Sequence, residues 1–173
     1  TEEKGIFELF KAYKELLESR HDIGLILCGP AEIKNEQNII LFDEIREISN
    51  VQYFGQVDNP LEYMACCDVF VLPSWREGFG LVNIEANSVG LPVVTTDIVG
   101  CKDSIEDQKT GILIESKNVS ALLEALKLLI DDPELRIEMG QNGIKRVKDL
   151  YDRKKIWNTL LEEYERMNRA VKA

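Results

Sequence analysis

The stretch DVFVLPSWREGFGLVNIEANSVGLPVVTT, residues 68–96, holds two strand-like segments separated by a glycine-containing loop and a short helix-like segment. Residues 68–72 and 92–96 are rich in β-branched and aromatic side chains, which is typical of buried strands. Between them, Leu81, Ile84 and Val89 are spaced as one face of a helix, and Gly90 suits its end. The stretch therefore predicts a strand, a loop, a helix and a second strand, in that order.

The same alternation continues through the rest of the chain. Strands are expected at 23–29, 51–54 and 112–114, and helices at 1–20, 32–49, 61–67, 118–130, 132–148 and 152–171. Strands that alternate with helices predict an α/β fold, here a doubly wound parallel sheet with helices on both faces. We expect residues 1–150 to form this Rossmann-like domain and residues 151–173 to form a separate C-terminal helix.

The loop between the two strands of the opening stretch has the composition of an anion site. Gly78 and Gly80 flank Phe79 directly before the helix, and glycine lets the backbone approach a ligand closely. The first turn of a helix leaves N–H groups unpaired, which favours a phosphate. Glu77 and Glu85 bracket this point, and ionised carboxylates accept hydrogen bonds from hydroxyl groups. The pattern suits a ligand with a central phosphate and hydroxylated rings on both sides.

The run Arg-Glu-Gly-Phe-Gly-Leu-Val-Asn-Ile-Glu-Ala, followed by Gly-Leu-Pro-Val-Val, resembles the donor-site motif of the family 4 retaining glycosyltransferases. The resemblance implies the C-terminal, donor-binding half of a GT-B fold. It also implies that Glu77 lies beside the hydroxyls of the donor sugar and that Glu85 binds the ribose diol. The backbone of the loop would face the sugar and the diphosphate through Gly78, Phe79, Gly80 and Leu81. Taken alone, two glutamates near a helix start also fit a solvated helix face that complements the dipole.

Three further segments match the family in the same way. Lys4 stands before Gly5 as in the Lys-Gly element, whose lysine contacts the donor diphosphate, so Lys4 and Glu77 are the expected catalytic residues. On two residues alone, Lys4 also fits a surface lysine in a first helical turn. The resemblance and the turns after two strands place Gly29 and Val57 near the ribose and the base. The loop after the strand 92–96 either touches the donor or is a plain surface loop.

The resemblance also implies that one strand is missing from this sequence. The family's sheet has six strands, of which five are recognised here, and the absent first strand lies in the middle of the usual order 3-2-1-4-5-6. We expect the natural protein to extend upstream, to include that strand, a phosphate-binding arginine and an N-terminal acceptor domain. The C-terminal helix should cross toward that domain, and this chain alone should not transfer sugar.

Composition excludes several other classes of function. The chain has 173 residues and a net charge of −10, which argues against nucleic acid as a partner. No apolar run approaches the roughly 20 residues of a membrane span, although peripheral association is compatible with the sequence. Four cysteines without a Cys-x-x-Cys pair, and the single His21, give no metal site. We expect a cytoplasmic protein that needs neither a metal nor a cofactor.

The leading hypothesis is transfer of a sugar from a nucleotide diphosphate sugar to an acceptor hydroxyl, in polysaccharide or glycoconjugate assembly. The acceptor would be a sugar or a lipid-linked glycan held by the N-terminal domain. Two alternatives stay open at this point. The first is a GT-B enzyme that hydrolyses or epimerises a nucleotide sugar. The second is a nucleotide-sugar-binding subunit or interaction module that is inactive without a partner chain.

Overall fold

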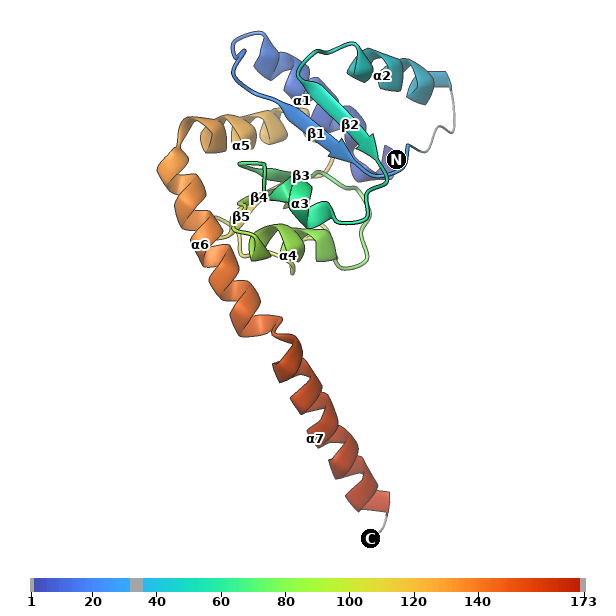
Figure 1. The fold of residues 1–173 in the computed structure, drawn as a ribbon, viewed down its shortest axis with the longest axis vertical. Coiled ribbons are helices and arrows are strands. Elements are labelled where there is room, and N and C mark those ends of the chain that lie inside the picture. Colours follow the sequence, from blue (N-terminus) through green and yellow to red (C-terminus); the bar gives the residue numbers. More distant parts are fainter. Residues whose placement is uncertain (1, 32–35, 172–173) are drawn as a thin grey trace.

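The computed structural model describes residues 2–31 and 36–171 and shows strands that alternate with helices (Figure 1). The elements, in chain order, are a 3-10 turn at Glu2–Lys4, α1 (Ile6–Leu17), β1 (Leu25–Cys28), α2 (Glu36–Arg46), β2 (Val51–Gly55), α3 (Pro60–Met64), β3 (Phe70–Leu72), α4 (Leu81–Ser88), β4 (Val93–Thr96), β5 (Gly111–Ile114), α5 (Val119–Asp131), α6 (Pro133–Leu150) and α7 (Arg153–Val171).

Every predicted strand and helix within the described residues is present, but several are shorter than expected. The predicted helix 1–20 divides at Gly5, whose φ of 71° ends the 3-10 turn before α1 begins. Lys4 therefore lies in a turn that precedes the helix. The start of the predicted helix 32–49 lies outside the described residues, and its last turn ends at Arg46.

All strand pairs are parallel, which confirms the predicted α/β class. The described strands form two sheets, with the orders β1-β2 and β3-β4-β5. Strands β1 and β3 are not hydrogen-bonded to each other, so each sheet has an open edge there. The gap between β1 and β3 lies where the resemblance places the absent central strand, whereas the division into two separate sheets was not predicted.

A cavity of about 1090 Å³ lies between the two open edges. Its walls include the strand residues Leu25, Leu27, Phe70 and Val71. Side chains from helices on both sides close it, among them Leu9, Leu16, Tyr63, Met64 and Leu126. The gap between the sheets is thus lined by side chains of the kind that normally pack against a strand.

Side chains of the three-stranded sheet alternate between two cores, as the two-residue period of a strand requires. Val94 and Ile112 point into a core made with α1 and α5, which holds Leu122 and Leu129. Val93 belongs to a second core on the other side with α3 and α4, which holds Met64, Ala86, Leu91 and Ile105. Helices therefore cover both faces, and the loops after the strands gather at one edge.

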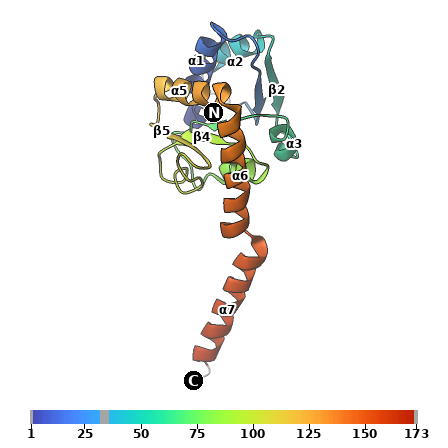
Figure 2. The same cartoon turned by 90° about the vertical axis from the view of Figure 1, so that its left-hand side faces the viewer.

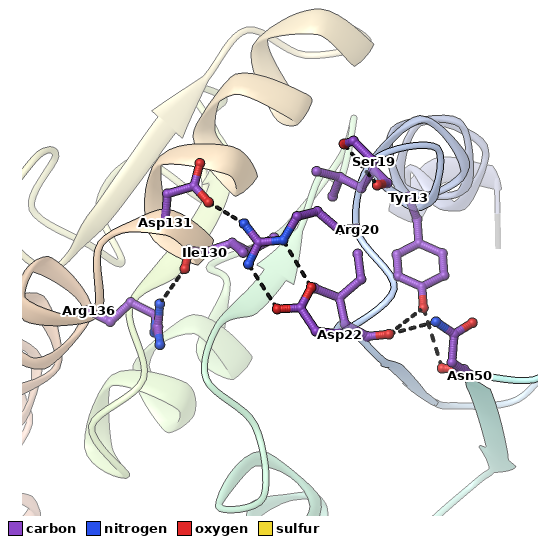
Figure 3. Close-up of polar contacts among 10 residues, drawn as sticks. Tyr13, Ser19, Arg20, Asp22, Asn50, Ile130, Asp131 and Arg136 are labelled. Atoms are coloured by element: carbon purple, nitrogen blue, oxygen red, sulfur yellow. Dashed lines mark hydrogen bonds and ion pairs between the residues drawn. The ribbon is translucent and has the colours of Figure 1, made fainter.

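The β1-β2 sheet is attached to the rest of the molecule through α1 and a polar cluster near the end of that helix (Figure 3). The guanidinium of Arg20 bridges Asp22 and Asp131, and so ties the residues after α1 to the end of α5. The hydrogen bonds from the Arg20 guanidinium hold the pKa of the Asp22 carboxyl below its ordinary value. Tyr13 and Asn50 both donate to the carbonyl of Ile23. These contacts join the two sheets without any strand pairing.

Helix α7 extends away from the remaining elements (Figures 1 and 2). It carries a row of apolar side chains that are about half exposed or more: Ile156, Trp157, Leu160, Leu161, Tyr164 and Met167. Among the described helices, none has the length and apolar character needed to cross a membrane. Helix α6 ends at Leu150 and α7 begins at Arg153, and the separate role of residues 151–173 stays a prediction.

Candidate functional site

The loop of residues 73–80 leaves β3 and ends at Gly80, which caps the N-terminus of α4. Gly80 has φ 57° and ψ 39°, and no side chain caps this helix start. A Cβ here would lie 2.9 Å from the carbonyl oxygen of Gly100 and 3.0 Å from Asn83 Nδ2, so only glycine fits without displacement. The amides in the first turn of α4 therefore follow directly after a loop that packs tightly against the backbone at Gly100.

The structure brings the two expected catalytic residues together. Lys4 Nζ lies 2.5 Å from Glu77 Oε2, although the residues are 73 positions apart. The 3-10 turn before α1 is fixed against the loop because the Trp75 N–H donates to the Glu3 carbonyl at 2.8 Å. Gly5 packs so closely on the loop that a Cβ would lie 2.1 Å from the Pro73 carbonyl oxygen. The resemblance implied a separate role for each residue, but this ion pair was not predicted.

The other candidates of the motif lie on the exposed side of the loop. Phe79 and Leu81 are 42% and 65% exposed, and a side chain at Gly78 would meet open space. Glu85 is exposed on α4, and within the described chain its carboxylate makes no hydrogen bond or ion pair. These positions leave Gly78, Phe79, Leu81 and the Glu85 carboxylate accessible to a ligand, whereas Gly80 is buried.

Gly29 and Val57 lie at the carboxyl ends of the neighbouring strands β1 and β2. Both line the cavity between the sheets, and Lys4 lines it as well. Tyr53 shapes the turn after β1, because its hydroxyl donates to the Gly29 carbonyl at 3.0 Å and accepts from the Ala31 N–H at 3.0 Å. Sequence reasoning missed Tyr53. Glu85 and the loop residues 78–81 are not among the residues that line this cavity.

A buried polar network beneath the loop was also missed. Asn83 Nδ2 donates to Ser104 Oγ at 2.9 Å and lies 3.3 Å from Thr95 Oγ1. Thr95 in turn donates to the Leu72 carbonyl, and Thr96 donates to the Ser74 carbonyl at 2.6 Å. All four side chains are fully buried. The sequence feature that could have indicated this network is Thr95 and Thr96, a pair of threonines at the end of an otherwise apolar strand.

Nucleophilic and metal chemistry find little support around this loop. Burial raises the pKa of the thiols of Cys28 and Cys67, so both stay protonated at neutral pH. Among the residues that the structure describes, no group of three or more His, Cys, Asp or Glu side chains is arranged to hold a metal ion. The groups available to a ligand at this site are a cation, two carboxylates and backbone amides.

Residues 1–146 match the family described as "Glycosyl transferases group 1". The chain belongs to this family. It is 34% identical over 166 residues to the capsular polysaccharide biosynthesis glycosyltransferase CapM of Staphylococcus aureus. That alignment covers 95% of this chain and 43% of CapM, so the chain spans less than half the length of that relative.

Two solved structures show the same fold. Sucrose-phosphate synthase from Thermosynechococcus elongatus superposes with a TM-score of 0.85 at 26% identity, over 98% of this chain and 44% of that one. Anabaena HepE, solved in complex with UDP-glucose, superposes with a TM-score of 0.82 at 21% identity. That match covers 95% of this chain and 46% of HepE, and at this identity it shows the fold alone. The predicted membership of the GT-B glycosyltransferases is confirmed.

Proposed function

We propose that this chain is the donor-binding part of a retaining glycosyltransferase of family 4, which acts in the cytoplasm on a nucleotide diphosphate sugar. The observation that carries the proposal is the Lys4–Glu77 pair beside the N-terminus of α4, which no side chain caps. The loop of residues 73–80 and the adjacent 3-10 turn bring together a cation, a carboxylate and the start of a helix. These groups match a ligand that joins a diphosphate to a hydroxylated sugar. The relative CapM and the neighbour HepE with UDP-glucose point in the same direction.

The arrangement gives each group a defined task. As the sugar–phosphate bond breaks, negative charge develops on the departing diphosphate. Lys4 and the first-turn amides of α4 would stabilise that charge, which is the type of contribution that often dominates catalysis. Lys4 has three N–H donors, so it can keep its bond to Glu77 while it donates to a phosphate oxygen. Glu77 would hold the sugar hydroxyls and Glu85 the ribose diol.

The remainder of the enzyme is part of the same proposal. The acceptor, a sugar or a lipid-linked glycan, would be bound by a further domain, and the reaction would serve polysaccharide or glycoconjugate assembly. The exposed apolar side chains of α7 offer a surface for that domain. No metal or cofactor is required, because Lys4 and the helix start supply the positive charge that a diphosphate needs. The chain on its own is then expected to bind a donor without transferring sugar.

The proposal is tested by calorimetric titration of UDP, GDP, ADP and their common sugar conjugates into the wild-type chain and into Glu85→Ala. A hydrogen bond to a charged group is worth about 1.5–3 kcal/mol, so loss of the ribose contact should weaken binding at least about tenfold. Glu124→Ala, which removes an exposed carboxylate from α5, is the matched control and should bind as wild type. A folded chain that binds no nucleotide, even when a strand fills the gap between the sheets, would contradict the proposal.

A second test concerns the Lys4–Glu77 pair. Lys4→Met leaves the Glu77 carboxylate without its cation next to the diphosphate, so affinity for the diphosphate should fall about tenfold. Adding Glu77→Gln should restore part of that loss in the affinity for the free nucleoside diphosphate, because the repulsion is removed. The exposed pair Lys14–Glu44, 2.7 Å apart, provides the matched double-mutant cycle and should show no effect on binding. Equal losses for the nucleoside and its diphosphate would rule out the phosphate role.

A further inference from the structure

The loop that follows β4, which includes residues 97–104, is in direct backbone contact with residues 73–80, which we call the glycine loop. A Cβ at Gly100 would lie 2.4 Å from the carbonyl oxygen of Glu77 and 2.8 Å from that of Gly78. The Gly100 carbonyl in turn lies against Gly80, as described above. With no side chain between the two segments, a displacement of residues 100–104 is passed on to Glu77 and to the start of α4. Whatever holds residues 100–104 therefore sets the geometry of the candidate site.

The end of α6 holds this loop through two consecutive carbonyls. Arg146 donates through Nη2 to the Asp103 carbonyl at 3.1 Å and through Nη1 to the Ser104 carbonyl at 3.2 Å. The same Nη1 lies 3.3 Å from the Tyr151 hydroxyl, which itself donates to the Asp103 carbonyl at 3.3 Å. Both side chains are partly buried. A planar guanidinium can serve two neighbouring acceptors at once, which the ammonium of a lysine does less well.

Tyr151 also contacts the glycine loop itself. Its ring meets the ring of Phe79 edge-on, with the centroids 6.4 Å apart and an interplanar angle of 69°. Tyr151 caps the C-terminus of α6, where its N–H donates to the Val147 carbonyl at 2.8 Å. One tyrosine at a helix end thus touches both the loop after β4 and the loop that carries Glu77.

We propose that Arg146 and Tyr151 are positioning residues, which fix Glu77 and the N-terminus of α4 by clamping residues 100–104 and Phe79 to the end of α6. They act through the backbone contact at Gly100 and, for Tyr151, also through the ring of Phe79. The relevance of this clamp to sugar donors rests on the proposed function, whereas its effect on the loop does not. A ligand that closes on the loop should depend on both residues.

The chain offers a matched control on the same helix. Arg136 also donates to two consecutive carbonyls, those of Leu129 and Ile130, at 2.6 and 2.9 Å. It lies at the α5–α6 turn and is partly buried like Arg146. Arg136→Lys therefore also removes a guanidinium that serves two consecutive carbonyls, here through Nη1 alone, without touching the glycine loop. A merely structural role would make Arg146→Lys and Arg136→Lys behave alike.

The experiment compares Arg146→Lys, Arg136→Lys, Tyr151→Phe and Tyr151→Leu by hydrogen exchange and by nucleotide titration. For Arg146→Lys, amide protection of residues 78–83 and 101–105 should fall about tenfold, with β1 and β2 unchanged, and nucleotide affinity should fall about three- to tenfold. Tyr151→Phe keeps the ring against Phe79 and should have a smaller effect than Tyr151→Leu. Arg136→Lys should leave protection of residues 78–83 as in wild type.

The outcomes separate this proposal from the proposed function. If Arg146→Lys loosens residues 78–83 selectively but the chain binds no nucleotide, even when a strand fills the gap between the sheets, the clamp stands and the donor-binding function falls. If nucleotide binds the wild type and Arg146→Lys neither loosens the loop nor weakens binding, the clamp is wrong and the function stands. Equal loosening of residues 78–83 in Arg146→Lys and Arg136→Lys would also overturn the positioning role.

Discussion

Placing a β-strand in the gap between β1 and β3 should raise the melting temperature of this chain by roughly 5–15 °C. Each of the two sheets ends in an unpaired strand edge at this gap, and the cavity there is lined by apolar side chains. A strand of about five residues would bury three or four large apolar side chains, worth about 1.5–3 kcal/mol each. Ordering its backbone costs about 1–2 kcal/mol per residue, which roughly offsets the apolar burial, and the hydrogen bonds to the two open edges, about 0.5–1.5 kcal/mol each, supply the net gain.

The strand can be supplied at the amino end of the chain. The Glu3 carbonyl accepts from Trp75, three residues past β3, so the described chain starts beside the end of that strand. An added segment rich in Val and Ile is compared with a Gly-Ser segment of equal length, and melting is followed by circular dichroism. The thiols of Cys28 and Cys67 line the cavity and should be alkylated more slowly when the strand is in place. An equal rise with the Gly-Ser segment would contradict the prediction.

Gly100→Ala should destabilise the chain by about 2–4 kcal/mol and abolish nucleotide binding. Gly100 has φ 94°, which an alanine rarely adopts, and its Cβ would lie 2.4 Å from the Glu77 carbonyl oxygen. That neighbour is backbone, so the strain can be relieved only if the loop that carries Glu77 moves. Both the stability of the fold and the geometry of the candidate site are therefore affected by one methyl group.

The measurement combines urea unfolding with nucleotide titration. Gly24→Ala is the matched control, because Gly24 has no positive φ and its Cβ would meet only the Asn50 carbonyl oxygen, at an ordinary 3.5 Å. It should change the free energy of unfolding by less than about 0.5 kcal/mol and leave binding unchanged. If Gly100→Ala unfolded at the same urea concentration as wild type, the close contact between the two loops would be wrong.

Most of the local structure could be predicted because it depends on short-range patterns. Short apolar runs rich in β-branched side chains marked β3, β4 and β5, and the helical period marked α5 and α6 with Pro133 in the first turn. Gly80 could be predicted to precede a helix next to an anion site, because the conformational freedom of glycine and the amphipathic pattern after it both act within a few residues. The bounds were less accurate at α1 and α3, where tertiary contacts decide how far a helix continues.

The candidate site was predicted only in part. Glu77, Glu85 and Lys4 were recognised because their segments resemble the family's motifs, yet the ion pair between Lys4 and Glu77 joins residues 73 positions apart. No feature of the sequence marked α6 as relevant to the site, yet this helix carries Arg146, which donates to the Asp103 and Ser104 carbonyls. An arginine on an exposed-looking helix has no local feature that reveals which carbonyls it will reach.

The sequence by itself determined the α/β class, the position of the glycine loop and the identity of the residues around it. These follow from side-chain periodicity and from the conformational freedom of glycine, which act within a few residues. Only the tertiary structure decided that the strands divide into two sheets, that Lys4 pairs with Glu77, and that Arg146 and Tyr151 hold the loop after β4. Those contacts join distant segments, and their formation depends on how the packed helices and strands place each backbone in space.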